Sequence, residues 1–446
     1  MLSLKQIIAK VIYHNDKELL DNSFKKSQDY FIIQIIFATA FTLLTGGVFL
    51  TGFAVYLGAN DVLIGYIGIM PNICGIFLIL CGSLLERFQN RKLLVIVLTL
   101  ISKFMICAIA LIPLFVPKSM QVYALVISVV IALTLQALSG IALNNWLISV
   151  VPENIRGRYF SIRQTFSLII NVSLPLVVGR MLDVISNKYE GFLIVFGLGL
   201  VMTIIEMLVF IRVGEHHSKS TRDEHFKLID VLRLPLANKE FIRYIIYVAL
   251  FFLALYISDS FTTVYMIRYL KLPYTSIIAF QMLMSIPQIF LLRVWGKISD
   301  KKGHHFILAT SIWFFVGESF FMGLTNSKTV YIFMPIAFIF AAIANSGFVI
   351  GVFNRRYAIV PEKGRIIYDG FYSAVIGLTF ILGPFIGGVI KTFISTNSFI
   401  QKNIAFGEFR ILFFISAFCI IVLQIAEAIM RKASKQIEVR KDAVET

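Results

Sequence analysis

The chain has 446 residues, of which 58% are hydrophobic and only 15% carry a charge. A water-soluble protein of this length cannot bury so much apolar surface, so the composition excludes a soluble globular protein. The net charge of +16 is concentrated in the two termini and in alternate loops, which is the bias that orients helices in a membrane and excludes a nucleic-acid-binding surface.

The first 30 residues are charged and precede any apolar segment. Leu4, Ile7 and Val11 recur at helical spacing among lysines. This pattern predicts an amphipathic helix within 4–26 that lies on the membrane surface. The segment is too long and too polar to be the start of a cleaved signal peptide.

Twelve apolar segments follow, each long enough to cross about 30 Å of hydrocarbon. The fold class predicted is an all-α membrane protein with two pseudo-symmetric bundles of six helices. Residues 31–213 form the first bundle, 214–240 a polar cytoplasmic linker, 241–430 the second bundle and 431–446 a basic, mobile tail. The expected segments are 31–57, 62–85, 93–115, 122–149, 159–184, 191–213, 241–269, 275–296, 305–325, 329–356, 366–392 and 409–430.

Two pairs of short loops indicate that the second half repeats the first. GSLLERFQNRK begins at Gly82, and GKISDKKGHH begins at Gly296. VPENIR at 151–156 is matched by VPEKGR at 360–365 at nearly the same offset. Repeated halves with matching loops are typical of membrane transporters.

The loops at Gly82 and Gly296 resemble the G-x-L-x-D-R-x-G-R-R/K signature of the major facilitator superfamily. The second copy matches at Gly296, Ile298, Asp300, Lys301 and Gly303, and the first at Gly82, Leu84, Arg87, Arg91 and Lys92. The first copy departs from the signature, because Glu86 replaces the usual Asp and Gln89 the usual Gly. The resemblance covers the whole chain in its architecture. It implies a fold of twelve helices in two halves.

The resemblance also implies a cytoplasmic gate between the two halves. Glu86 is expected near the start of the eleventh segment, around Arg365, and Asp300 near the start of the fifth, around Arg156. A carboxylate there would face a helix N-terminus and nearby arginines in one state and leave them in the other. The alternative is that these charges only set the topology. The expected gate residues are Gly82, Glu86, Arg87, Arg91, Gly296, Asp300, Lys301, Gly303, Arg156 and Arg365.

Asp259 lies within the seventh apolar segment, where a charge is costly and needs a reason. The repeat sets it opposite Gly46 of the first segment. In the family that the chain resembles, segments 1, 4, 7 and 10 line a central cavity, so Asp259 is the first candidate for a proton or cation site. A structural role, or a position near the outer surface, is the alternative.

Lys103 and Glu206 lie at similar depth in the third and sixth segments. We predict a structural ion pair, because pairing offsets part of the cost of burying each charge. Glu318 is the repeat counterpart of Lys103, and the sequence suggests no partner for it.

Polar side chains on the fourth, fifth and tenth segments are the other candidates for the cavity. Each of them is alternatively a helix–helix hydrogen bond. With Asp259, the candidate substrate or proton cavity consists of Gln136, Asn144, Asn145, Asn345, Asn354 and Arg163.

These features together predict a secondary active transporter of a small molecule, working by alternating access and coupled to protons. A neutral, amphiphilic or cationic solute fits best, because charges within the spans are few. The alternative is a non-transporting sensor or assembly protein of the same fold. The chain has no G-x-x-x-x-G-K-[ST] loop and no acid–base or nucleophile constellation, so we expect no enzyme activity, cofactor or metal. We expect a monomer in the plasma membrane, with both termini cytoplasmic.

Overall fold

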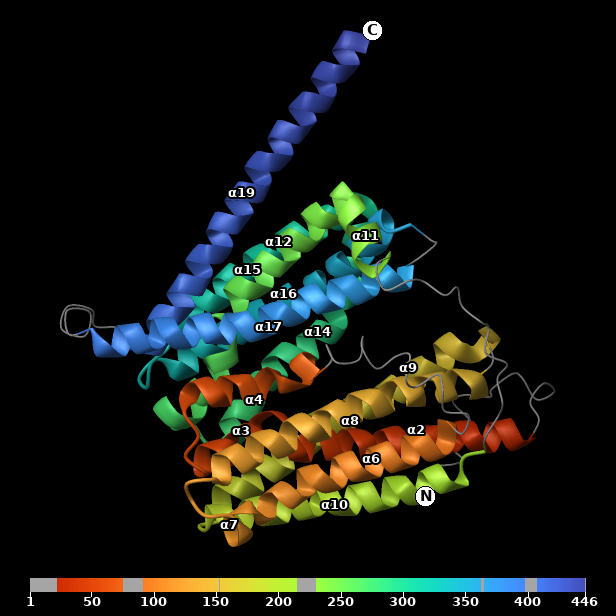
Figure 1. Cartoon of the computed structure of the whole chain (residues 1–446). Coiled ribbons are helices and arrows are strands. Elements are labelled where there is room, and N and C mark those ends of the chain that lie inside the picture. The colour runs from red at the N-terminus through yellow and green to blue at the C-terminus, as the bar shows by residue number, and fades with distance from the viewer. Residues whose placement is uncertain are drawn as a thin grey trace. The chain divides into compact units, whose positions relative to one another are not determined.

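The computed structural model describes residues 22–74, 91–151, 153–214, 230–361, 365–397 and 407–445. Within these residues the regular elements are helices, with no strand (Figure 1). The chain is an all-α protein, in agreement with the predicted fold class. The expected amphipathic helix at 4–26 lies almost wholly outside the described residues.

The first half of the sequence supplies six predicted spans, two of which are broken into shorter helices. The third span, for example, changes from α-helix to a 3-10 turn and back before Phe115. The elements are α2 (Asn22–Thr45), α3 (Gly47–Tyr56), α4 (Asp61–Cys74), α6 (Arg91–Ala108), η1 (Ile109–Leu111), α7 (Ile112–Phe115), α8 (Gln121–Val150), α9 (Glu153–Val184) and α10 (Lys188–Arg212).

The second half supplies the other six. Asn238 caps the start of its first predicted span, α12 (Lys239–Tyr256). The side-chain oxygen of Asn238 accepts a hydrogen bond from the backbone N–H of Phe241 at 3.0 Å. The elements are α11 (Asp230–Ala237), α12 (Lys239–Tyr256), η2 (Asp259–Phe261), α13 (Thr262–Val264), η3 (Tyr265–Tyr269), α14 (Tyr274–Lys302), α15 (His304–Leu324), α16 (Val330–Ile359), α17 (Arg365–Thr396) and α19 (Glu408–Glu445).

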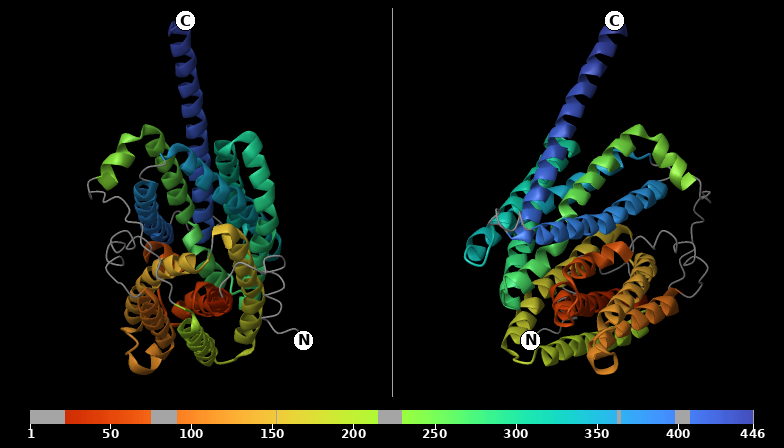
Figure 2. Two further views of the ribbon diagram at one scale, coloured as in Figure 1. Left: turned by 90° about the vertical axis from the view of Figure 1, so that its right-hand side faces the viewer. Right: turned by 60° about the vertical axis from the view of Figure 1, so that its left-hand side comes forward.

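Eleven of the spans in the described part of the chain are long and apolar enough to cross a membrane. The twelfth is α4, a shorter apolar helix whose predicted continuation lies outside the described residues. Two segments differ from the sequence-based expectation. Part of the expected linker is the helix α11, and the basic tail continues α19 as one helix to Glu445 (Figure 2).

The chain divides into two compact units that follow the sequence halves except at two helix starts. Residues 61–73 of α4 group with the second unit, and residues 273–278 at the start of α14 group with the first. These two segments are repeat counterparts, since each begins the second span of its half.

Each unit has its own aromatic core. In the first, Trp146 packs edge-on against Phe31 and stacks on Phe210, with ring centroids 5.1 and 5.9 Å apart. In the second, Phe251 lies 5.0 Å from Phe315 and 4.8 Å from Phe348. Apart from α2, these helices expose large apolar side chains on their other faces, as expected for helices surrounded by lipid.

Candidate functional site

The seventh span is interrupted at the residue that the sequence singled out. α12 ends at Tyr256, and the chain continues as a 3-10 turn over Asp259–Phe261 and a π-helical turn over Tyr265–Tyr269. The hydroxyl of Ser260 donates to the carbonyl of Tyr256, and Ser258 lies close enough to bond Leu255. Such bonds to the preceding turn bend helices. The expected segment 241–269 is therefore not one continuous α-helix.

The first span is interrupted at the repeat-equivalent position. α2 ends at Thr45, Gly46 is extended, and α3 begins at Gly47 with a φ of 49°. This left-handed conformation is strained for residues other than glycine. Gly46 is the residue that the repeat sets opposite Asp259. Interrupted helices at equivalent positions of two repeats are a common way to build a binding site in transporters.

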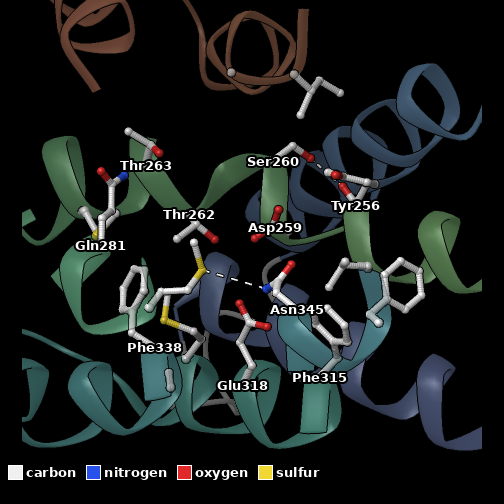
Figure 3. A pocket seen from close by; sticks show the side chains of 18 of the residues that line it. Tyr256, Asp259, Ser260, Thr262, Thr263, Gln281, Phe315, Glu318, Phe338 and Asn345 are labelled. Atoms are coloured by element: carbon white, nitrogen blue, oxygen red, sulfur yellow. Dashed lines mark hydrogen bonds between the residues drawn. The ribbon is translucent and has the colours of Figure 1, made fainter. Parts of the chain in front are cut away.

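Asp259 lines a cavity of about 400 Å³ within the second unit (Figure 3). Aromatic rings and thioethers form much of its wall, and hydroxyl and amide groups the rest. The apolar part includes Phe252, Tyr256, Phe315, Phe338, Phe348, Met266, Met284 and Met322, and the polar part Asp259, Ser260, Thr262, Thr263, Gln281, Ser285, Glu318 and Asn345.

Two carboxyl groups point into this cavity. Figure 3 shows Asp259 on η2 above the amide of Asn345 and Glu318 on α15 below it in this view. The Oε2 atom of Glu318 is buried and has no hydrogen-bond partner among the described residues. None of the described residues that line the cavity is a Lys, Arg or His.

Asn345 is held by its own helix. Its amide nitrogen donates to the carbonyl of Ala341 at 2.9 Å and lies 3.9 Å from the sulfur of Met284. The amide oxygen is therefore left to face the cavity. The cavity thus combines two acidic groups and one carbonyl acceptor with aromatic rings, thioethers and a few hydroxyl and amide groups, an arrangement suited to a proton or a cation.

The first unit contains a buried polar network. Lys103 and Glu206, expected to pair, form an ion pair and are 3% and 1% exposed. Gln34 donates to the other oxygen of Glu206 at 2.8 Å, and Arg163 donates to Gln34 at 2.9 Å. The Lys103 ammonium also lies 4.5 Å from the ring centre of Phe41.

The predicted cavity residues fall into separate groups. Asp259 and Asn345 line the cavity, whereas Asn354 lies further along α16 and does not. Arg163 belongs to the network with Gln34, and Gln136 is half-buried on α8 in the first unit. The side chains of Asn144 and Asn145 lie outside the described residues.

The expected cytoplasmic gate falls mostly outside the described part of the chain. Gly82, Glu86 and Arg87 are not described, nor are the side chains of Arg91, Arg156, Asp300 and Arg365. Gly296 and Lys301 lie on α14. Gly303 joins α14 to α15 with a φ of 85°, a left-handed turn that explains the glycine at this position of the signature.

A charged cluster surrounds the start of α4. Arg268 pairs with one oxygen of Asp61, while the other lies 2.7 Å from both the Lys391 ammonium and the Tyr269 hydroxyl. Lys391 also lies 3.4 Å from Glu408. These residues come from α4, η3, α17 and α19, so α4 is tied to the second unit by charge.

The start of α14 is tied to the first unit by one carboxylate. Asp183, near the end of α9, accepts hydrogen bonds from the backbone N–H groups of Tyr274 and Thr275 at 2.8 and 2.9 Å. It also accepts one from the Thr275 hydroxyl at 2.6 Å. A carboxylate at a helix N-terminus satisfies free N–H groups and opposes the helix dipole.

Three residues with contacts in these sites, Glu318, Asp61 and Asp183, are not among the residues that the sequence predicts for the cavity or the gate. Glu318 carries the same sequence signal as Asp259, an acidic residue inside an apolar span. Asp61 and Asp183 stand next to loops, where charges are ordinary, so the sequence carried no signal for their contacts.

The profile of the Major Facilitator Superfamily matches residues 30–327. The chain belongs to this superfamily. The match covers both signature loops and the interrupted first and seventh spans, and it agrees with the resemblance seen in those loops. Membership shows that the chain is a multi-pass membrane protein of a transporter family.

Solved structures of transporters share the fold. The nucleoside transporter NupG has a TM-score of 0.66 with 15% identity, covering 92% of this chain and 100% of its own. The xylose transporter XylE from E. coli has a TM-score of 0.58 with 14% identity, covering 91% and 98%. At these identities the likeness concerns the fold alone.

Among curated proteins, a segment of the chain is similar to vacuolar basic amino acid transporter 5 of Saccharomyces cerevisiae. The two are 26% identical over 131 residues, which is 29% of this chain. The chain spans only about a fifth (22%) of the length of that relative in the match.

Proposed function

We propose that this chain is a secondary active transporter that moves a small molecule by alternating access and is coupled to protons. The observation that carries the proposal is the interrupted seventh span, which presents Asp259 to an enclosed cavity that also holds Glu318. Membership of a transporter superfamily supports the same reading.

Proton coupling rests on the two carboxyl groups. A carboxylate in an apolar enclosure is costly when charged and unpaired, and protonation removes that cost. Loading Asp259 or Glu318 with a proton would therefore lower the barrier to a rearrangement that moves the cavity away from water. Release on the other side would return the charge.

The proposal of alternating access is based on the helix starts at 61–73 and 273–278, each of which groups with the unit formed mainly by the other half of the sequence. We propose that the Asp61 cluster and the Asp183 cap act as latches on the non-cytoplasmic side, and that the loops with Glu86 and Asp300 act on the cytoplasmic side. The Asp61 cluster and the Asp183 cap are sets of charge-assisted hydrogen bonds that would have to break for the non-cytoplasmic side to open.

The proposed domain plan is that of the sequence: 31–213 and 241–430 as the two bundles, 214–240 as the linker, and 1–30 and 431–446 as terminal segments. The excess of basic residues in the termini and alternate loops supports cytoplasmic termini. We propose a monomer in the plasma membrane.

The test is solute uptake into proteoliposomes with and without an imposed proton gradient. The names of the similar proteins suggest the panel: nucleosides, xylose and basic amino acids. Gradient-driven accumulation of a solute supports the proposal. Binding of a solute without any movement across the membrane would favour a non-transporting sensor of the same fold.

A further inference from the structure

The cavity in the second unit has an unbalanced charge. Asp259 and Glu318 both face it, and the part of its lining that the structure describes contains no basic side chain. One Glu318 oxygen is buried without a hydrogen-bond partner among the described residues. An uncompensated buried charge is unfavourable. A proton or a bound cation can remove that cost, and the described residues of the lining supply no positive group of their own.

The wall around the carboxylates is aromatic. Phe252 and Phe348 have ring centroids 5.3 Å apart, and Phe315 lies 5.8 Å from Phe348. Tyr256 stacks on Phe252 at 5.9 Å. Ring faces attract cations, and they do so more strongly when water is excluded.

An inorganic cation fits this wall poorly. Calcium and magnesium need about six or more oxygen ligands, and transition metals favour groups of His, Cys and carboxylates. In the described part of the chain, no three or more His, Cys, Asp or Glu side chains gather in a way that would hold a metal ion. The cavity of about 400 Å³ is large enough for an organic molecule.

We infer that this cavity binds an organic cation, with its amine or amidine group between Asp259 and Glu318 and its apolar body against the phenylalanine rings. The inference deepens the proposed function, on which it rests, by naming the class of solute that the cavity carries. Asn345 offers its amide oxygen as a further acceptor. The titratable groups in the lining are Asp259, Glu318 and Tyr256, so a proton and the cation compete for the same two carboxylates.

The test is equilibrium binding to the purified full chain in detergent, which requires no transport. Benzamidine is the cationic probe, and benzamide is its neutral counterpart of nearly the same shape. Phenyltrimethylammonium is a second probe whose charge cannot be lost. We expect benzamidine to bind at least about tenfold more tightly than benzamide, the effect of one charge-assisted hydrogen bond. Phenyltrimethylammonium has no N–H donor, so its tighter binding than benzamide should come from charge and from the aromatic ring faces alone.

Variants assign the binding to the site. Asp259→Asn and Glu318→Gln keep the side-chain shapes and should each weaken cation binding about tenfold or more while leaving benzamide unchanged. Gln281→Lys adds a positive charge to the lining and should abolish cation binding. Glu240→Gln is the control, because it removes a carboxylate of the same unit whose side chain is 59% exposed.

Failure of this inference is distinguishable from failure of the proposed function. Equal binding of benzamidine and benzamide, or no binding of either cation, overturns the inference, even if a neutral solute accumulates in proteoliposomes. Cation binding that survives both carboxyl variants also overturns it. Cation binding that depends on both carboxylates supports the inference, even if no gradient drives uptake and the proposed function fails.

Discussion

Replacing Lys103 by methionine would leave the Glu206 carboxylate buried with Gln34 as its remaining donor. The two side chains of the ion pair are 4% and 2% exposed, so water cannot replace the lost partner. Removing one member of a buried pair typically costs about 3–5 kcal/mol of folding free energy. Glu206→Gln should cost a similar amount, because it leaves the ammonium facing the Phe41 ring without a counter-charge.

The double variant Lys103→Met with Glu206→Gln should be less destabilised than either single variant, because it leaves no buried charge unpaired. The assay is reversible unfolding in mixed micelles, which gives the free energy of unfolding of all four proteins in a double-mutant cycle. Arg355 and Glu240 provide the control, since their 30% and 59% exposed pair should couple by only about 0.2–1 kcal/mol. Losses that simply add for Lys103 and Glu206 would refute the reasoning.

Three further predictions concern the latches and a turn. Asp183→Asn removes the charge of the cap that holds the start of α14, and Asp300→Asn removes the charge that the proposed cytoplasmic latch uses. The two variants should shift the two-state equilibrium about tenfold in opposite directions. Labelling of a cysteine introduced at Ser285 by an impermeant reagent from the cytoplasmic side should fall in the first variant and rise in the second; shifts in the same direction would contradict the latch assignment. Gly303→Ala should destabilise the fold by about 1–2 kcal/mol because its φ is 85°. Gly296→Ala is the control, because a Cβ atom at Gly296 meets open space, and it should leave the thermal unfolding midpoint nearly unchanged. Equal effects of Gly303→Ala and Gly296→Ala would exclude backbone strain as the cause.

The sequence predicted the fold class because apolar length, charge bias and the repeated loops are properties of the chain itself. It also predicted the Lys103–Glu206 contact, since two opposite charges at equal depth in apolar spans have few other ways to be satisfied. The sequence singled out Asp259 by similar reasoning, because a charged residue inside an apolar span is costly. In the structure Asp259 lines the cavity.

The sequence could not predict what depends on three-dimensional neighbours. That Glu318 shares a cavity with Asp259 follows from how α15 packs beside the interrupted seventh span, and periodicity carries no information on this. The contacts of Asp61 and Asp183 depend on helix starts that cross to the other unit. A helical pattern also continues through Ser258 unchanged, so the interruption there was invisible until backbone hydrogen bonds were seen.

The most direct test of the central claim compares wild type with Asp259→Asn in proteoliposomes, using a solute that the wild type accumulates. Asparagine resembles the protonated carboxyl in shape and charge but cannot release a proton. The account predicts that the variant loses accumulation driven by the proton gradient and retains exchange of internal for external solute. A variant that still accumulates the solute as the wild type does would show that Asp259 is not the coupling residue.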